Sequence, residues 1–336
     1  MSLPPARPPA RPPAPTWVAS LRHRSDLLRE IRSRFDAAGF FEVQPPCLSG
    51  ECVVDAYLDP ISIAVEDLGL PVGDFSSSSG RLFLQTSPES AMKRMLVDGG
   101  PSIYSIGPVF RRGERGSRHN LEFTMLEWYE VGADASRSIE RLADLARLTL
   151  RQDGVEVITY RDLFRRQLGV DPLDCELAEL QKLVAAEDET LSRSIGPHRD
   201  GLLDVLMSVR IEPTLGHQCP TIVTRYPLTQ AALAKRSSED PDCAERFELF
   251  AAGVELANGY DELLDPDELV RRFEANNRIR QAAGREVIPM PSRFIEAMRR
   301  GLPPCSGVAL GIDRLLMVRL GMNEIEDVLP LPIERA

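Results

Sequence analysis

The 336-residue chain has no apolar run long enough to span a bilayer, and its beginning lacks the apolar stretch of a signal peptide. Its six cysteines are scattered and form no CxxC pair, so reduced thiols in a cytoplasmic protein are favoured over a disulfide framework or a zinc site. Basic residues are fewer than acidic ones: 40 lysine and arginine residues against 51 acidic residues give a net charge of −11. Because an acidic surface repels phosphate backbones, extensive contact with tRNA or DNA is disfavoured unless a local basic patch overrides it.

Residues 1–16 contain a Pro/Ala/Arg repeat, which predicts a disordered tail biased toward the polyproline conformation. Its arginines would suit a mitochondrial address, but the density of proline argues against the amphipathic helix that such an address needs. Regular patterns begin near Trp17. Residues 17–336 therefore predict a single domain with one large core, with a division into two domains as the alternative.

The patterns over residues 17–336 indicate both helices and strands. Residues 25–39 have the apolar spacing of a helix, with Ser25 as its N-cap and Gly39 as its stop. Further helices are predicted at 136–152 and 201–210, a loop at 73–81, and strands at 40–43, 81–87, 102–110 and 121–131, the last two antiparallel. Residues 246–263 predict a hairpin that turns near Ala251 and Ala252, and 306–321 a strand that runs into a helix. Because helices do not alternate regularly with strands, an α+β fold is favoured, with a mostly antiparallel sheet flanked by helices.

A basic loop joins the two strands predicted at 102–110 and 121–131. Its sequence, RRGERGSRHN, places four arginines and His119 beside two glycines. Such a density of cations on a flexible backbone suits a polyphosphate, although a solvated basic loop is the plain alternative. A second element favours the nucleotide: Arg314 follows Gly307, Gly311 and Asp313 at the strand-to-helix turn, where glycines admit a flat ligand close to the backbone.

An acidic pair in the predicted hairpin suggests a metal. If the chain turns at Ala251 and Ala252, Glu248 and Glu255 lie roughly opposite each other across the ladder. Like charges in that arrangement are destabilising, and a magnesium ion that bridges them to phosphate oxygens would remove the conflict. In a different register, both side chains would simply face water.

These segments resemble the three signature motifs of the class II aminoacyl-tRNA synthetases, specifically their lysyl branch. Motif 1 resembles SDLLREIRSRFDAAGF followed by FFEVQPP, with Pro46 as its proline. Motif 2 resembles FRRGERGSRHNLEF, and motif 3 resembles GVALGIDR. The resemblance implies ATP and Mg²⁺ as cofactors, with Arg111 and Arg314 as the catalytic residues. It further implies that Arg111 holds the α-phosphate, that Arg118 or His119 and Arg314 hold the outer phosphates, that Phe123 stacks under adenine, and that Glu248 and Glu255 hold the metal.

The substrate pocket is carried over from the same branch. TMLEWY and ELANGYDEL resemble segments that bind lysine. The resemblance assigns the ε-ammonium to Glu127, Tyr129 and Glu262, and the α-amino and carboxylate groups to the neighbourhood of Glu89 and Asn258. A buried ammonium must be matched by carboxylates, so this set is physically reasonable.

Three departures from the lysyl branch redirect the expected function. The anticodon-binding OB-fold that such synthetases place before motif 1 is missing here, which is similar to the elongation factor P–lysine ligases. Ala309 stands where the synthetases have glycine, as it does in those ligases, and this implies a preference for (R)-β-lysine. Gly113 stands where motif 2 usually has glutamate, so Glu114 is the expected contact for adenine.

The expected reaction has two steps in a cytoplasmic enzyme that dimerises through motif 1. Lysine or (R)-β-lysine is activated as its adenylate, and the acyl group is then passed to a lysine of elongation factor P, with tRNA disfavoured as acceptor. Two rivals remain at this stage. One is a freestanding enzyme that passes lysine to tRNA or a small amine, and the other is a catalytically dead synthetase paralogue that acts as a regulatory binding module.

Overall fold

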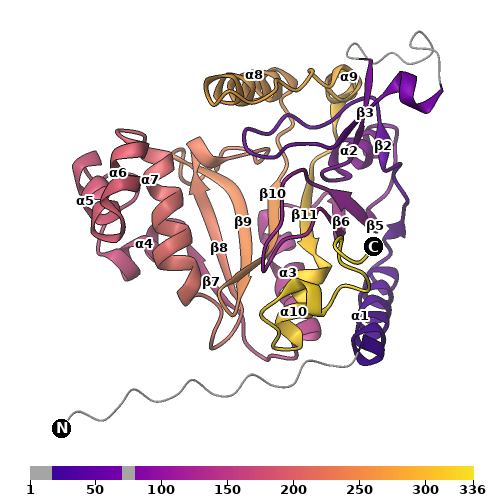
Figure 1. Cartoon of the computed structure of the whole chain (residues 1–336), viewed down its shortest axis with the longest axis horizontal. Helices are drawn as coiled ribbons and strands as arrows, with labels where there is room; N and C mark the ends of the chain where they lie inside the picture. Colours follow the sequence, from indigo (N-terminus) through magenta and orange to yellow (C-terminus); the bar gives the residue numbers. More distant parts are fainter. Residues whose placement is uncertain (1–16, 70–79) are drawn as a thin grey trace.

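The computed structural model describes residues 17–69 and 80–336 (Figure 1). The disordered tail predicted for residues 1–16, and most of the loop predicted at 73–81, lie outside these residues. No helix in the described part of the chain is both long and apolar enough to cross a membrane.

An eight-stranded, mostly antiparallel sheet forms the centre of the molecule, as the α+β prediction required (Figure 1). Only its two outermost pairs, β1 with β5 and β7 with β8, are parallel. The strands in spatial order are β1 (Phe41–Glu42), β5 (Ile103–Phe110), β6 (Glu122–Val131), β11 (Cys305–Gly311), β10 (Val254–Asp261), β9 (Cys243–Ala251), β8 (Thr221–Pro227) and β7 (Glu156–Thr159). The central four strands carry half of the predicted site residues. A small sheet of β2 (Leu48–Ser49), β4 (Arg81–Leu84) and β3 (Ser62–Ala64) lies beside them.

Helices cover the large sheet in separate groups. α1 (Trp17–Ala37), α3 (Ala135–Leu150) and α10 (Ile312–Arg319) share one apolar core with the sheet, in which Trp128 and Leu126 of β6 are fully buried. α2 (Glu89–Val97), α8 (Pro266–Ala282) and α9 (Ser292–Gly301) form a second core, which includes Tyr129. Trp128 and Tyr129 are successive residues of one strand and therefore point to opposite faces. The face of β6 that carries Tyr129 also carries the candidate site.

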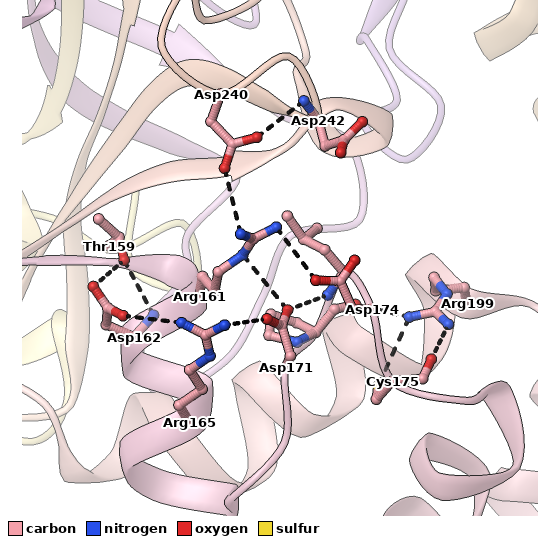
Figure 2. A network of polar contacts seen from close by, with 12 residues as sticks. Thr159, Arg161, Asp162, Arg165, Asp171, Asp174, Cys175, Arg199, Asp240 and Asp242 are labelled. Carbon is pink, nitrogen blue, oxygen red and sulfur yellow. Dashed lines mark hydrogen bonds and ion pairs between the residues drawn. The ribbon is translucent and has the colours of Figure 1, made fainter.

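A third group of helices lies beyond the β7–β8 end of the sheet (Figure 1). It consists of α4 (Tyr160–Leu168), α5 (Leu177–Glu187), α6 (Glu189–Ile195) and α7 (Arg199–Leu206), the last continued by a π-helical turn at Met207–Ile211. Figure 2 shows how α4 is tied down: Arg161 lies between Asp171, Asp174 and Asp240, while Arg165 pairs with Asp171 at 2.6 Å. Because Asp240 precedes β9, this network joins the helical group to the sheet.

α1 begins earlier than the sequence indicated. Its end agrees with the prediction, since Gly39 follows with φ of 80°. Ser25 is not an N-cap, however, because the helix already begins at Trp17, two turns before it. Tertiary contacts account for the difference: Ser20 donates to the carbonyl of Asp327, and Arg24 donates to the buried carboxylate of Asp313.

Candidate active site

A cavity of about 720 Å³ lies over the central strands and receives all the predicted site residues. Their side chains come from separate segments of the chain, which the fold brings together. The cavity is lined by Glu89, Arg111, Glu114, Arg118, His119, Phe123, Glu127, Tyr129, Glu248, Glu255, Asn258, Glu262, Ala309 and Arg314.

Strand alternation explains how β6 and β11 contribute. Along β6, Phe123, Glu127 and Tyr129 fall on one face because successive side chains of a strand alternate. On β11, Gly307 pairs with Tyr129, and Ala309 pairs with Glu127. A Cβ at Gly307 would lie 2.3 Å from the Tyr129 ring and 2.5 Å from Glu262 Oε1. The absence of a side chain at Gly307 is therefore what lets Tyr129 and Glu262 meet over β11.

β10 contributes Glu255 and Asn258 to the cavity, and the shift in its pairing was not predicted from the sequence. The prediction that Glu248 and Glu255 lie opposite each other is wrong: Glu255 pairs with Phe250, and Glu248 pairs with Asn258. The register shifts by one residue between Glu255 and Ala257, as in a β-bulge. Without this shift, Glu255 and Asn258 would point to opposite faces because they are three residues apart. The extra residue turns both side chains toward the cavity.

One end of the cavity is cationic. The loop between β5 and β6 closes tightly, since the backbones of Gly116 and His119 exchange two hydrogen bonds. This places Arg118 against the carbonyl of Gly253 at 2.8 Å and His119 Nε2 at 2.6 Å from Arg314 Nη2. Because an arginine is always a donor, His119 accepts this bond. Burial and the nearby arginines lower the pKa of His119, which agrees with a neutral imidazole.

Arg111 lies at the same end, where its Nε donates a hydrogen bond of 3.4 Å to the carbonyl of Thr86. Its guanidinium stacks 5.1 Å from the centre of the Phe123 ring and lies 3.5 Å from Glu114. Gly113, which precedes Glu114 in the loop, has φ of 81°, a backbone conformation that glutamate rarely adopts. The backbone therefore explains why glycine stands there, and Glu114 is the carboxylate of this turn that lines the cavity.

Arg314 is held by the first turn of α10. The preceding Asp313 is 1% exposed, accepts a hydrogen bond from the backbone of Thr124, and pairs with Arg24 of α1 at 2.5 Å. The strand-to-helix turn predicted at this point is confirmed, and α1 fastens it to β6.

Glu248 and Glu255 could hold a divalent cation in the way predicted, through hard oxygen ligands. Glu248 accepts hydrogen bonds from Tyr226 and Arg246, each at 2.5 Å, whereas Glu255 lies 3.6 Å from Arg314. Burial and the neighbouring Glu248 raise the pKa of Glu255, although Arg314 opposes this shift. Among the described residues, no group of three or more acidic, histidine or cysteine side chains could hold a metal by itself. The donor set therefore fits Mg²⁺ that takes its remaining ligands from phosphates and water.

The opposite end of the cavity is acidic and buried. Glu127, 2% exposed, accepts hydrogen bonds from Ser87 and Tyr129 at 2.7 Å each. Burial, together with Glu89, raises the pKa of Glu127 to about 7. Asn258 Oδ1 is buried too, and no hydrogen-bond partner for it occurs among the described residues. An ammonium group would satisfy both acceptors.

Lys93, which is buried against the lining residues Glu89 and Glu262, is a residue that sequence reasoning missed. Its ammonium lies 2.5 Å from Glu89 on the same helix and 2.5 Å from Glu262. Glu262, predicted to bind a substrate ammonium, is thus already paired with an internal one. The signal available in the sequence was the spacing of Glu89 and Lys93, which are neighbours on one helical face at i and i+4.

With this geometry described, comparison with known proteins decides the family. Residues 14–335 match the model of the tRNA synthetases class II (D, K and N). The chain belongs to the class II tRNA synthetase family. Within it, the chain is 41% identical to the elongation factor P–(R)-β-lysine ligase of Yersinia enterocolitica, over 95% of this chain and 96% of that relative. The ligases of the same name from Yersinia pestis and Yersinia pseudotuberculosis are 40% identical over the same shares. Membership of a family of ATP-dependent synthetases and ligases agrees with the cationic and acidic ends of the cavity.

Proposed function

We propose that this protein activates (R)-β-lysine with ATP and transfers it to a lysine side chain of elongation factor P. The single observation that carries the proposal is the cavity itself, in which a cationic end suited to phosphates adjoins a buried acidic end suited to ammonium groups. The names of the similar ligases supply the substrate and the acceptor.

The proposed first step is an in-line attack of the substrate carboxylate on the α-phosphorus of ATP, with pyrophosphate as the leaving group. Arg111, whose ion pair with Glu114 is long at 3.5 Å, would stabilise the charge that develops on the α-phosphate. Arg314, His119 and Arg118 receive the outer phosphates, and Phe123 with Glu114 receives adenine. Mg²⁺ held by Glu248 and Glu255 would neutralise phosphate charge when bound.

In the proposed second step, the ε-amine of the acceptor lysine attacks the carbonyl carbon of the adenylate and AMP leaves. No protein nucleophile is required, in agreement with the cysteines: burial raises the pKa of Cys52 to about 11 and that of Cys243 to about 12. Residues 17–336 act as one catalytic domain in this proposal, and a translation factor as acceptor implies work in the cytoplasm.

Ala309 supports the choice of the β-amino acid. It lines the cavity between its strand neighbours Glu127 and Asn258. Because Asn258 is expected near the α-amino and carboxylate groups, the methyl group of Ala309 beside it would contact that part of the substrate. A group at this point can shift the preferred position of that amine by one carbon.

The decisive experiment incubates the protein with ATP and (R)-β-lysine, together with either elongation factor P or total tRNA. Intact mass spectrometry should show a gain of one β-lysyl group on elongation factor P, and acid gels should show no charged tRNA. Arg111→Ala, matched for expression and thermal midpoint, should lose the modification. Efficient charging of tRNA at physiological salt, with elongation factor P unmodified, would contradict the proposal.

A further inference from the structure

The cavity continues beyond the residues assigned to ATP and the amino acid, toward α7. On this α7 side it is lined by Tyr57, Tyr160, Asp200, Asp204, Thr229 and Gln230. Tyr57 and Asp204 are exposed, so the α7 side of the cavity opens to solvent. A group that is carried on a large molecule can therefore enter here.

Asp200 and Asp204 place two carboxylates on the α7 side. They are four residues apart on α7 and therefore lie one above the other on one face of the helix. Thr229 donates a hydrogen bond to Asp200 Oδ1 at 2.7 Å, and the amide of Gln230 donates to Asp204 Oδ1 at 2.8 Å. These neutral donors fix both side chains but leave both charges in place. Because like charges at this spacing repel, a cation bound between them would be favourable.

The nearest arginine does not supply that cation. Arg246 also lines the cavity, but its guanidinium donates to Glu248 at 2.5 Å and to the carbonyl of Gln230 at 2.6 Å. Within residues 17–69 and 80–336, neither Asp200 nor Asp204 forms an ion pair. The two carboxylates are therefore open to a cation from outside.

Tyr160 is a second, separate indication of a ligand. It is the first residue of α4, lines the cavity and is 1% exposed. Its ring lies 4.5 Å from that of Phe164 and 4.9 Å from that of Tyr226, but its hydroxyl has no hydrogen-bond partner in the described part of the chain. Burial, and then Asp204, raise the pKa of this hydroxyl well above its ordinary value, so it stays neutral. A buried hydroxyl without a partner is uncommon, and an ammonium would donate to it.

The opposite wall of the opening is the loop that carries Tyr57. The backbone N–H of Tyr57 donates to Asp55 at 2.7 Å, and Arg285 donates to the Tyr57 carbonyl at 2.7 Å, so the loop is held in place. Partial burial, then Asp204 and Asp200, raise the pKa of Tyr57, which agrees with a position across the opening from them. An exposed ring beside two carboxylates suits an organic cation.

The acceptors on the α7 side fit a primary ammonium better than a metal ion. Among the described residues, no three acidic, histidine or cysteine side chains are grouped so that they could hold a metal. An ammonium has three N–H donors, and two carboxylates and one hydroxyl supply three acceptors for them. Lysine carries its ammonium on a long flexible stem, so it can reach into a cavity from a protein outside it.

We propose that Asp200, Asp204 and Tyr160 form an entry subsite that binds the ε-ammonium of the acceptor lysine before transfer. This inference rests on the proposed function, because it concerns the acceptor of the second step. Tyr226 links the subsite to the ATP end of the cavity, since its ring lies beside Tyr160 and its hydroxyl donates to Glu248 at 2.5 Å. The subsite serves acceptor binding and has no part in forming the adenylate.

The test compares the two steps of the reaction in the double variant Asp200→Asn/Asp204→Asn, which keeps the shape of both side chains and removes their charges. Initial rates of modification of elongation factor P, measured by intact mass at several concentrations, give KM and kcat for the acceptor. KM should rise by about tenfold or more with kcat little changed, because hydrogen bonds to charged groups are lost. ATP–pyrophosphate exchange with (R)-β-lysine, which needs no acceptor, should stay within about twofold of wild type.

Glu140→Gln/Asp144→Asn is the matched control. Glu140 and Asp144 are also four residues apart on one helix, α3, and are 67% and 50% exposed outside the cavity. This variant loses the same net charge and should keep the wild-type KM for elongation factor P. An equal rise of KM in both double variants would show a general effect of net charge and overturn the inference. A parallel fall in pyrophosphate exchange would also overturn it, because the α7 residues would then act in the first step.

Tyr160→Phe distinguishes ligand binding from folding. The hydroxyl makes no hydrogen bond within the described residues, so its removal should leave the thermal midpoint equal to or above that of wild type. KM for elongation factor P should nevertheless rise by about fivefold. An unchanged KM in this stable variant would contradict the inference.

Two further outcomes are distinguishable. If the double variant on α7 does not fold, Asp204→Asn alone changes an exposed position and should still raise KM. If wild-type protein performs the exchange but leaves elongation factor P unmodified, the proposed acceptor is wrong and the inference falls with it. Modification by wild type with an unchanged KM in the α7 variants would overturn the inference alone.

Discussion

Ala309 is the residue at which the preference between lysine isomers can be tested directly. Its methyl group lines the cavity between Glu127 and Asn258. Ala309→Gly removes that methyl, opens the pocket, and should shift the ratio of kcat/KM for the two isomers toward α-lysine. One methyl group discriminates by about 1–3 kcal/mol, so a change of roughly tenfold is expected in pyrophosphate exchange. An unchanged ratio would show that Ala309 does not face the amino group.

Glu127 should release protons when substrate binds. Burial raises its pKa to about 7, so the unliganded carboxyl is partly protonated at neutral pH, and a bound ammonium favours its ionised form. Release should be greatest near pH 6 and decline by pH 8, with Glu262 adding to it. Calorimetry of (R)-β-lysine binding in phosphate and in Tris measures the effect as a difference in apparent enthalpy. Identical enthalpies in the two buffers at pH 6 and 7 would contradict the prediction.

The raised pKa of Glu127 also makes the free energy of unfolding depend on pH. The folded-state pKa of Glu127 lies above its ordinary value of 4.5, so the folded protein binds more protons between the two values. The contribution of Glu127 to the free energy of unfolding is therefore fully present below pH 4.5 and is lost as pH rises through about 7. Substrate ammonium groups would offset that loss.

At the scale of elements, α1 supports the turn between β11 and α10, which lies far from it in sequence. Arg24 of α1 is the cation paired with Asp313, and Arg24 also donates to the Thr124 hydroxyl. Arg24→Met should leave Asp313 buried without its partner, which costs about 3–5 kcal/mol. The thermal midpoint should fall by several degrees, and Arg314 should lose its position.

Two quantities should be measured for Arg24→Met, namely its thermal midpoint and its affinity for ATP. Arg29→Met on the same helix is a suitable control, because Arg29 is 72% exposed and its ion pair, at 2.6 Å, is with neighbouring Asp26. Such exposed pairs contribute about 0–1 kcal/mol. Equal effects of the two substitutions would show that α1 does not hold the turn.

At the scale of the whole molecule, the predicted dimer depends on motif 1. β1 lies at one end of the large sheet, and Phe41 on it is 62% exposed. An edge strand offers unpaired backbone groups with which a second copy of the chain can pair. Phe41→Glu should weaken association by about tenfold or more, measured by light scattering across a dilution series. Val157, 53% exposed on β7 at the other end of the sheet, offers the matched control Val157→Glu, which should leave association unchanged.

The sequence by itself determined the class of fold, the antiparallel neighbours at 102–110 and 121–131, the hairpin at 246–263 and the residues that gather in the cavity. It could do so because strand alternation, turn residues and the basic loop are local patterns, and because motifs such as GVALGIDR are specific. The alternation of Glu127 and Tyr129 with buried Trp128, for example, follows from the period of a strand alone.

Only the tertiary structure decided the register of β9 and β10, the true start of α1 and the partner of Glu262. The hairpin turns at Ala252 and Gly253, because Ala251 pairs with Val254; the turn therefore comes one residue later than predicted, and the opposed arrangement of Glu248 and Glu255 was wrong. The first turns of α1 are stabilised by Asp313 and Asp327, almost three hundred positions or more away. Lys93 meets Glu262 for the same reason: burial brings distant charges together, and no local pattern records such a pair.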